Sequence, residues 1–222
     1  MRSTLSALLL LLLSASWGCG GDALELFVDL RTDFVPVFEF DEVRLILEPG
    51  GLVQRPADAA SYVDGARVAE FGDLTLGQHR LVVTLFLDGE AIVDRTIRLA
   101  LRETSALTVL MTRDCADVVC DPGSTCRGAM CIDQGCSELE PGVCGAPGCA
   151  TDADCAPASA CATGQCVAGA CIARPDGAAC GVDQWCNADL GCQAIGGAGG
   201  LPGEEVTLAP GWVIEEWIDF YN

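Results

Sequence analysis

Fifteen cysteines are the residues of this chain most able to do chemistry, and their positions divide them into one and fourteen. Cysteine sulfur can close a disulfide, bind a metal as thiolate or carry a lipid. Cys19 stands alone behind an apolar leader, and an even number of cysteines remains when it is set aside. An even, dense set favours a complete disulfide framework in an oxidising compartment. The fourteen expected disulfide cysteines are Cys115, Cys120, Cys126, Cys131, Cys136, Cys144, Cys149, Cys155, Cys161, Cys166, Cys171, Cys180, Cys186 and Cys192.

Zinc binding is the main alternative for these sulfurs, and their spacing argues against it. Structural zinc sites bring cysteines together in close pairs, typically as C-x-x-C. Here the shortest gaps hold four residues and recur regularly along the segment. This spacing favours disulfides, and we predict no metal site among the cysteines.

Catalysis finds little support in the residue types present. His79 is the single histidine, and it stands at the start of an expected strand with no nucleophile motif beside it in the sequence. The chain also lacks a phosphate-binding loop and the H-E-x-x-H zinc motif. We therefore predict a structural role for His79, no catalytic residue, no enzyme activity and no cofactor.

Two pairs of acids could supply oxygen ligands for calcium. Asp152 and Asp154 precede Cys155, and Glu138 and Glu140 form the second pair. Neither pair belongs to the D-x-D-x-D-G loop that would make a calcium site specific. Aspartates in glycine-rich segments more often cap turns. Turn capping is therefore the favoured role, and calcium stays as the alternative.

Residues 1–18 have the layout of an export signal. Arg2 is basic, and the apolar stretch 5–13 is well short of the ~20 residues of a membrane-spanning helix. The run Ser16-Trp17-Gly18-Cys19 resembles the lipobox of bacterial lipoproteins. That resemblance implies cleavage before Cys19, a lipid on its sulfur and a lipidated N-terminus over residues 19–22. The protein would then be anchored in the cell envelope, at the outer membrane; the alternative is ordinary cleavage and secretion.

The charge of the chain restricts its partners. Thirty-two acidic residues stand against twelve basic ones, all of them arginine, for a formal net charge of −20. Such a surface repels phosphate backbones, so we predict no nucleic-acid binding. The expected partners are a membrane, through the N-terminal lipid, and a protein or polysaccharide whose identity the sequence leaves open.

Residues 23–113, the β domain, alternate apolar and polar residues in several short runs. Apolar side chains at every second position in 24–30 and 81–87 are typical of half-buried strands, and Asp88-Gly89 is a hairpin-turn signal. Six or seven such strands predict an antiparallel β-sandwich. The run from Leu74 to Gly77 resembles the corner of immunoglobulin-like and prealbumin-like modules, with His79 in the place of an aromatic residue. Because this domain contains no cysteine, we expect it to fold independently of reductant.

Residues 114–192, the cysteine-rich segment, predict a loop-dominated module held by disulfides, since strand-forming runs are absent. The gaps of Cys120, Cys126, Cys131 and Cys136 recur thirty-five residues later, from Cys155 to Cys171. This repeat predicts equivalent disulfide partners for Cys126 and Cys161, for Cys131 and Cys166, and for Cys136 and Cys171. The connectivity itself stays open.

The stretch from Cys149 to Cys180, with its "TDADC" entry and evenly spaced cysteines, is similar to the Dickkopf-type cysteine-rich pattern. Comparable repeats occur in cysteine-rich lipoproteins of myxobacteria and their relatives. The resemblance implies a disulfide framework and says nothing about a ligand. After it we expect a glycine-rich linker over 193–203 and an aromatic segment over 204–222, which either docks on a domain or begins a further one.

Together these observations predict a non-catalytic envelope lipoprotein with a structural, adhesive or binding role. Two alternatives remain from the sequence. The first is a secreted disulfide-knotted binding or inhibitor module. The second is the non-catalytic stalk of a larger surface protein of which this sequence is a truncated part.

Overall fold

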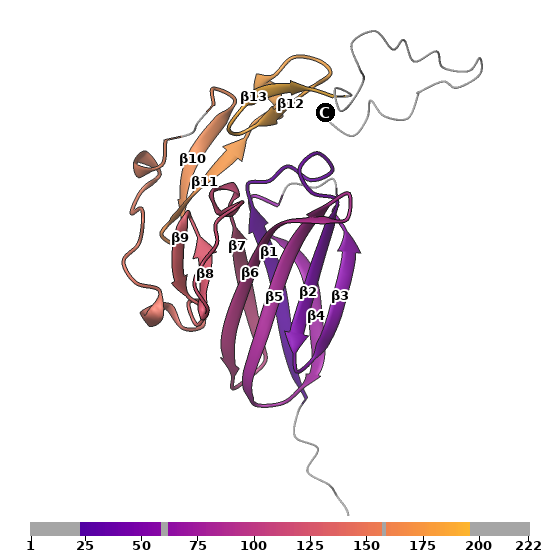
Figure 1. Ribbon diagram of the computed structural model, residues 1–222, viewed down its shortest axis with the longest axis vertical. Helices are drawn as coiled ribbons and strands as arrows, with labels where there is room; N and C mark the ends of the chain where they lie inside the picture. Colours follow the sequence, from indigo (N-terminus) through magenta and orange to yellow (C-terminus); the bar gives the residue numbers. More distant parts are fainter. Residues whose placement is uncertain (1–22, 59–61, 157–158, 196–222) are drawn as a thin grey trace, which may run out of the picture.

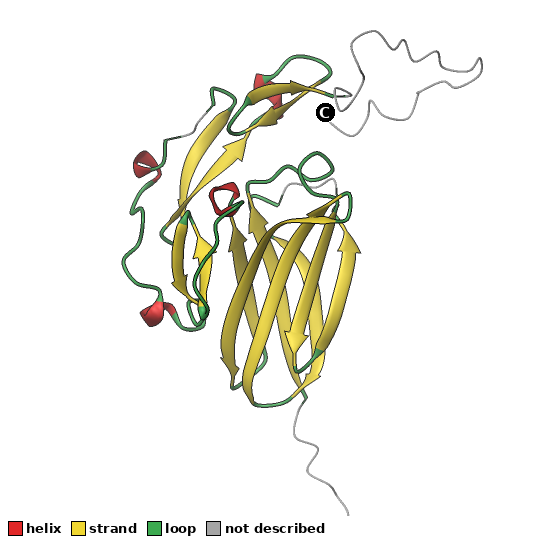
Figure 2. Cartoon of the chain, in the orientation of Figure 1, coloured by secondary structure: helices red, strands yellow, loops and turns green. Residues whose placement is uncertain are grey.

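The computed structural model describes residues 23–58, 62–156 and 159–195. The expected signal peptide, Cys19 with the lipobox-like run before it, and the aromatic segment 204–222 therefore lie outside the described residues, as does most of the expected linker. The described part consists of strands, turns and short 3-10 helices (Figure 2). Within that part, no helix combines the length and the apolar character needed to cross a membrane.

Seven strands build the β domain as two sheets (Figure 1). One sheet has the order β4-β1-β7 and the other the order β3-β2-β5-β6. The strands are β1 (Leu24–Thr32), β2 (Glu42–Glu48), β3 (Gly51–Pro56), β4 (Ala66–Leu74), β5 (Gly77–Leu87), β6 (Glu90–Leu101) and β7 (Ser105–Met111).

The expectation of a purely antiparallel domain is wrong at one pairing. β7 runs parallel to β1, from Leu26 opposite Ser105 to Thr32 opposite Met111. The other strand pairs of the two sheets are antiparallel. The chain passes from β6 in one sheet to β7 in the other, so no hairpin fixes the direction in which β7 joins β1.

The apolar side chains at every second position of these strands are buried, because a strand places alternate residues on the same face. Leu26, Val28 and Leu30 of β1 and the alternate leucines and valine of β5 are fully buried and share one core between the sheets. Asp88 and Gly89 both have positive φ and form the expected hairpin turn between β5 and β6. β3 was not expected, because its side chains are mostly exposed and carry little apolar alternation.

The cysteine-rich segment is mostly loops and turns, as expected, but the expectation that it lacks strands is wrong. The segment forms three short antiparallel hairpins, and the last strand extends two residues into the expected linker. Strands this short have no apolar run to reveal them, and disulfides hold them instead. The elements are η1 (Arg113–Cys115), β8 (Ser124–Arg127), β9 (Met130–Asp133), η2 (Pro141–Val143), η3 (Asp152–Asp154), β10 (Ala162–Val167), β11 (Ala170–Pro175), η4 (Gly177–Ala179), β12 (Gln184–Asn187) and β13 (Gly191–Ala194).

Seven disulfides pair the fourteen cysteines of this segment. In each hairpin two cysteines face each other across the strands, yet each is bonded to a cysteine that precedes the hairpin. The facing pairs are Cys126 and Cys131, Cys166 and Cys171, and Cys186 and Cys192. The disulfides are Cys115–Cys126, Cys120–Cys131, Cys136–Cys144, Cys149–Cys166, Cys155–Cys171, Cys161–Cys186 and Cys180–Cys192.

The predicted equivalence of partners at thirty-five residues is therefore wrong. Cys126 bonds backward to Cys115, whereas Cys161 bonds forward to Cys186. Likewise Cys131 and Cys166 take non-equivalent partners, as do Cys136 and Cys171.

The structural repeat has a period of forty residues, from the hairpin CRGAMCI to the hairpin CVAGACI. In each hairpin four residues lie between the facing cysteines. The middle two of these residues form the turn, and both have positive φ. The connection after the first hairpin (Cys131 to Cys136) and the one before the second (Cys161 to Cys166) also hold four residues between cysteines, so the gaps alone do not identify the register.

The cysteine-rich segment lies along one side of the β domain, next to β6 and β7 (Figure 1). These are edge strands of the two sheets. The segment satisfies outward N–H groups on both: Thr96 N donates to Thr125 Oγ1 (3.1 Å), Arg98 N to the Gln134 carbonyl (2.7 Å) and Thr108 N to Glu138 (3.1 Å). The segment thus covers two edges that would otherwise be free to pair with another chain.

The hydrophobic core also crosses the expected boundary at residue 113. Cys115 and Cys126 are buried members of the cluster formed by the two sheets, and Val118, Cys120 and Leu139 pack against it. The disulfide Cys115–Cys126 therefore contributes to the core of the β domain. For this reason the structure does not support the expectation that reductant leaves the β domain unaffected.

Candidate functional site

A cavity of about 470 Å³ lies between the β domain and the cysteine-rich segment. β1, β6 and β7 supply its wall on one side, and the first two hairpins with the loop between them supply the other. The loop residues Gly145 and Ala146 at its rim are exposed. The lining includes three arginines, one from each of three strands: Arg31, Arg95 and Arg127, here called the arginine cluster.

Arg95 is the most buried of the three, with a relative exposure of 3%. It occupies a position in β6 where the alternation otherwise points apolar side chains into the core. Its Nη1 donates to the Leu110 carbonyl (2.5 Å) and its Nη2 to the Cys136 carbonyl (3.4 Å), while its buried Nε has no hydrogen-bond partner. Burial and the neighbouring Arg127 lower the pKa of Arg95 to about 9, so it stays a cation at neutral pH.

Arg127 approaches the same cysteine from β8. Its Nη1 lies 3.2 Å from Cys136 Sγ, its Nη2 donates to the Ala168 carbonyl, and its Nε is buried without a partner. Burial lowers the pKa of Arg127, and Glu138 opposes that change. Arg31 donates from Nε to the Val63 carbonyl (2.7 Å). The guanidinium groups of the cluster therefore donate mainly to backbone carbonyl oxygens.

The acids that line the cavity form no close ion pair with these arginines, although the charge of Glu138 acts on both Arg95 and Arg127. Asp29 lies 2.5 Å from Arg67, and Asp64 lies 2.6 Å from Arg174; neither of these two arginines lines the cavity. Glu138 accepts the Thr108 N–H. Among the described residues, no carboxylate oxygen lies within 4.0 Å of a side-chain nitrogen of the arginine cluster.

A second polar contact joins the two parts of the chain near η1. Arg113, 7% exposed by its side chain, forms a bidentate pair with Glu39, with both N–O distances 2.7 Å. Asn187 of β12 donates to the same carboxylate (2.8 Å). Burial lowers the pKa of Arg113, but its bonds to Glu39 and the charge of Asp33 outweigh burial and the pKa is raised.

Asp33 lies within this contact and connects three segments. Its Oδ1 accepts the Arg113 backbone N–H (2.8 Å) and its Oδ2 that of Ala173 in β11 (3.2 Å). Burial raises the pKa of Asp33 to about 6, although the charge of Arg113 acts in the opposite direction. Nearby, Phe38 stacks on Trp185 with ring centroids 5.0 Å apart. The contact attaches the last two hairpins to the β domain.

His79 is buried at the start of β5 and links two turns. Its Nδ1 lies 3.0 Å from the Pro49 carbonyl oxygen and its Nε2 2.8 Å from the Thr75 carbonyl oxygen. Both ring nitrogens therefore face backbone acceptors, and His79 ties the turn after β2 to the corner before β5. This arrangement agrees with the structural role expected for His79.

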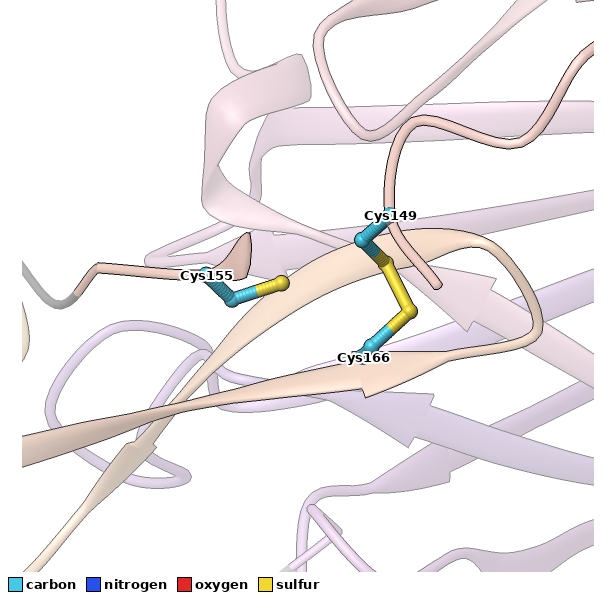
Figure 3. A group of neighbouring side chains, drawn as sticks. All are labelled: Cys149, Cys155 and Cys166. Atoms are coloured by element: carbon cyan, nitrogen blue, oxygen red, sulfur yellow. A yellow bond between two sulfur atoms is a disulfide. The ribbon is translucent and has the colours of Figure 1, made fainter. Parts of the chain in front are cut away.

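Three sulfurs gather where η3 meets the second hairpin (Figure 3). Cys149, Cys155 and Cys166 place their Sγ atoms within 4.8 Å of one another, as do Cys161, Cys180 and Cys186 further along. Each sulfur already belongs to a disulfide, and Figure 3 shows the bond from Cys149 to Cys166. Because a metal needs a thiolate, these groups cannot bind one while the disulfides are intact.

The acids considered for calcium take part in local hydrogen bonds. Asp154 accepts the N–H groups of Ala150 and Thr151, both at 2.8 Å, and these bonds lower its pKa. The contacts of Asp154 are those of the turn-capping role that the sequence favoured. Asp152 instead accepts the Cys166 N–H of β10 (2.9 Å) and ties η3 to the second hairpin. Glu138 accepts the Thr108 N–H, and Glu140 is exposed.

The arginine cluster was missed by sequence analysis, although one signal for it was present. Arg95 stands between Val93 and Ile97 in an apolar register of β6, where a cation is unexpected. Arg31 and Arg127 gave no such signal, because only the fold brings their strands together. Comparisons of the chain with protein-family models, curated proteins and solved structures find no match.

Proposed function

We propose that this chain is a non-catalytic lipoprotein of the cell envelope, anchored at the outer membrane through Cys19. Its role is structural, adhesive or binding, toward a protein or polysaccharide. The finer description of the β domain, as an immunoglobulin-like or prealbumin-like sandwich, and the Dickkopf-like character of the repeats belong to the same proposal.

The observation that carries the proposal is the complete pairing of the cysteines from Cys115 to Cys192. Each of them bonds another member of that set. Cys19 therefore has no partner left within the chain, and it directly follows an export signal. A free thiol is disfavoured in an oxidising compartment, and lipidation of its sulfur removes it.

A binding role is supported by how the cysteine-rich segment is held. Hydrogen bonds from β6 and β7 hold its first hairpin and the residues that follow it, and the Glu39–Arg113 contact holds its last two hairpins. A surface fixed at both ends loses little conformational entropy when a partner binds. Such preorganisation suits adhesion or recognition, and it equally suits the alternative of a secreted inhibitor module.

The anchor is tested by fractionating a bacterial host that expresses the full chain. The wild type should sediment with the membranes, and Cys19→Ser should move into the soluble fraction. Ser14→Ala, next to the lipobox but outside it, is the matched control and should stay with the membranes. A wild type that is already soluble would favour the secreted alternative.

A further inference from the structure

The arginine cluster is unusual for this chain because of its charge environment. The chain has 32 acidic residues and twelve basic ones. Six of the eleven described arginines have a carboxylate within 4.0 Å. The other five have none, and three of these line the cavity, among them the buried Arg95. A buried cation without a counter-ion is costly, and chains normally pair it.

The guanidinium groups also keep unused donors. An arginine offers five N–H donors, and the hydrogen bonds of Arg95 and Arg127 use two on each. Both residues bond to Cys136, which places their like charges close together. The backbone carbonyls that accept from Arg95 and Arg127 carry no net charge, and Glu138 offsets the repulsion between the two cations only in part.

We propose that this cavity binds a small organic carboxylate. The carboxylate group of the ligand would accept N–H bonds from Arg95 and Arg127, the geometry for which a guanidinium fork is suited. The body of the ligand would lie against the apolar part of the lining, which includes Leu110, Ile132 and Val167. The volume of about 470 Å³ lies within the range of small-molecule sites and exceeds the needs of an inorganic anion.

The apolar lining decides between a carboxylate and phosphate. A doubly charged phosphate has four oxygens to hydrate and no apolar surface to bury against Leu110 and Ile132. The described cavity also contains Glu138, whose negative charge opposes a dianion more than a monoanion. Arg95 and Arg127 together with Glu138 carry one net positive charge, which a monocarboxylate balances and a dianion exceeds.

The site is tested by calorimetric titration of the full chain with its disulfides intact. The probes are acetate, hexanoate, benzoate and glucuronate, with inorganic phosphate for comparison and chloride at matched ionic strength. At least one organic carboxylate should bind, and its neutral amide should bind at least tenfold more weakly to the same wild-type protein. This comparison needs no variant, so it holds whatever a substitution does to folding.

Arg127→Gln should weaken binding of the same carboxylate at least tenfold, and Arg127→Lys should recover part of the lost affinity. Arg80→Gln is the matched control, because neither Arg80 nor its partner Glu48 lines the cavity; the affinity of this variant should be unchanged. The proposal is overturned if no carboxylate binds, if acid and amide bind alike, if phosphate binds as tightly as the best carboxylate, or if a folded Arg127→Gln binds normally. None of these outcomes depends on the anchor at Cys19.

Discussion

Glu39 and Arg113, seventy-four residues apart in the sequence, form a bidentate ion pair at the junction of the β domain and the cysteine-rich segment. The pair is mostly buried, and Asn187 donates to the same carboxylate from β12. This one carboxylate therefore joins an early loop, the end of the β domain and the last hairpin. Its loss should affect both parts of the chain.

Glu39→Gln should lower the free energy of unfolding by about 3–5 kcal/mol, because it leaves Arg113 as a buried charge without its main partner. Glu48→Gln is the matched control, since Glu48 pairs with Arg80 at an exposed position. That substitution should cost no more than about 1 kcal/mol. Chemical denaturation followed by tryptophan fluorescence measures both, and equal losses would contradict a special role for Glu39.

Asp33 predicts a specific pH dependence of stability. Its pKa is about 6 in the folded protein and 3.8 in the ordinary carboxyl group. The folded state binds the Asp33 proton more tightly than the unfolded state does. The stability that this protonation contributes is therefore fully present below pH 3.8 and is lost as the pH rises through about 6. The loss is on the order of 3 kcal/mol.

Asp33→Asn should flatten this part of the pH profile, because an amide cannot titrate. Urea denaturation of both proteins between pH 4 and pH 7.5 provides the comparison. The difference in stability between wild type and variant should change as the pH rises from 4 through about 6 and level off toward pH 7.5. Parallel profiles would show that Asp33 titrates normally.

The alternation of apolar residues predicted most of the β domain, since burial on one face imposes a period of two. It could not predict the parallel pairing of β7 with β1, which depends on how the chain crosses between the sheets. It also could not predict β3, whose exposed side chains carry no such pattern.

In the cysteine-rich segment, spacing predicted the number of disulfides that could form but not their register. Identical four-residue gaps occur within hairpins, as between Cys126 and Cys131, and in connections, as between Cys131 and Cys136. Only the turn residues distinguish the two cases. The arginine cluster depends on three strands meeting, which no local pattern encodes.

The two ends of the disulfide framework should differ in their effect on the β domain. Replacing Cys115 and Cys126 together with serine should cost about 2–5 kcal/mol and lower its melting temperature, because this disulfide belongs to the shared core. Replacing Cys180 and Cys192 is the matched control, since neither residue packs against that core. Differential scanning calorimetry measures the two variants. A β-domain transition that is unchanged in the first variant would restore the expectation of independent folding.

Gly164 tests the packing of η3 against the second hairpin. A Cβ at this position would overlap the Cys155 carbonyl oxygen, so the backbone must move. Gly164→Ala should destabilise the segment and impair formation of Cys155–Cys171, whereas Gly142→Ala meets nothing within 4 Å and should be tolerated. Non-reducing peptide mapping after oxidative refolding reads out both. Native pairing at wild-type yield in Gly164→Ala would contradict this packing.

Mass spectrometry of the mature N-terminal peptide tests the proposed function most directly. The full chain would be expressed in a bacterial host, extracted from membranes with detergent and digested without reduction. The account predicts a first residue Cys19 carrying a diacylglycerol on its sulfur, together with no free thiol among the other fourteen cysteines. An unmodified N-terminus after ordinary cleavage, or Cys19 in a disulfide with a cysteine of the 115–192 set, would contradict it.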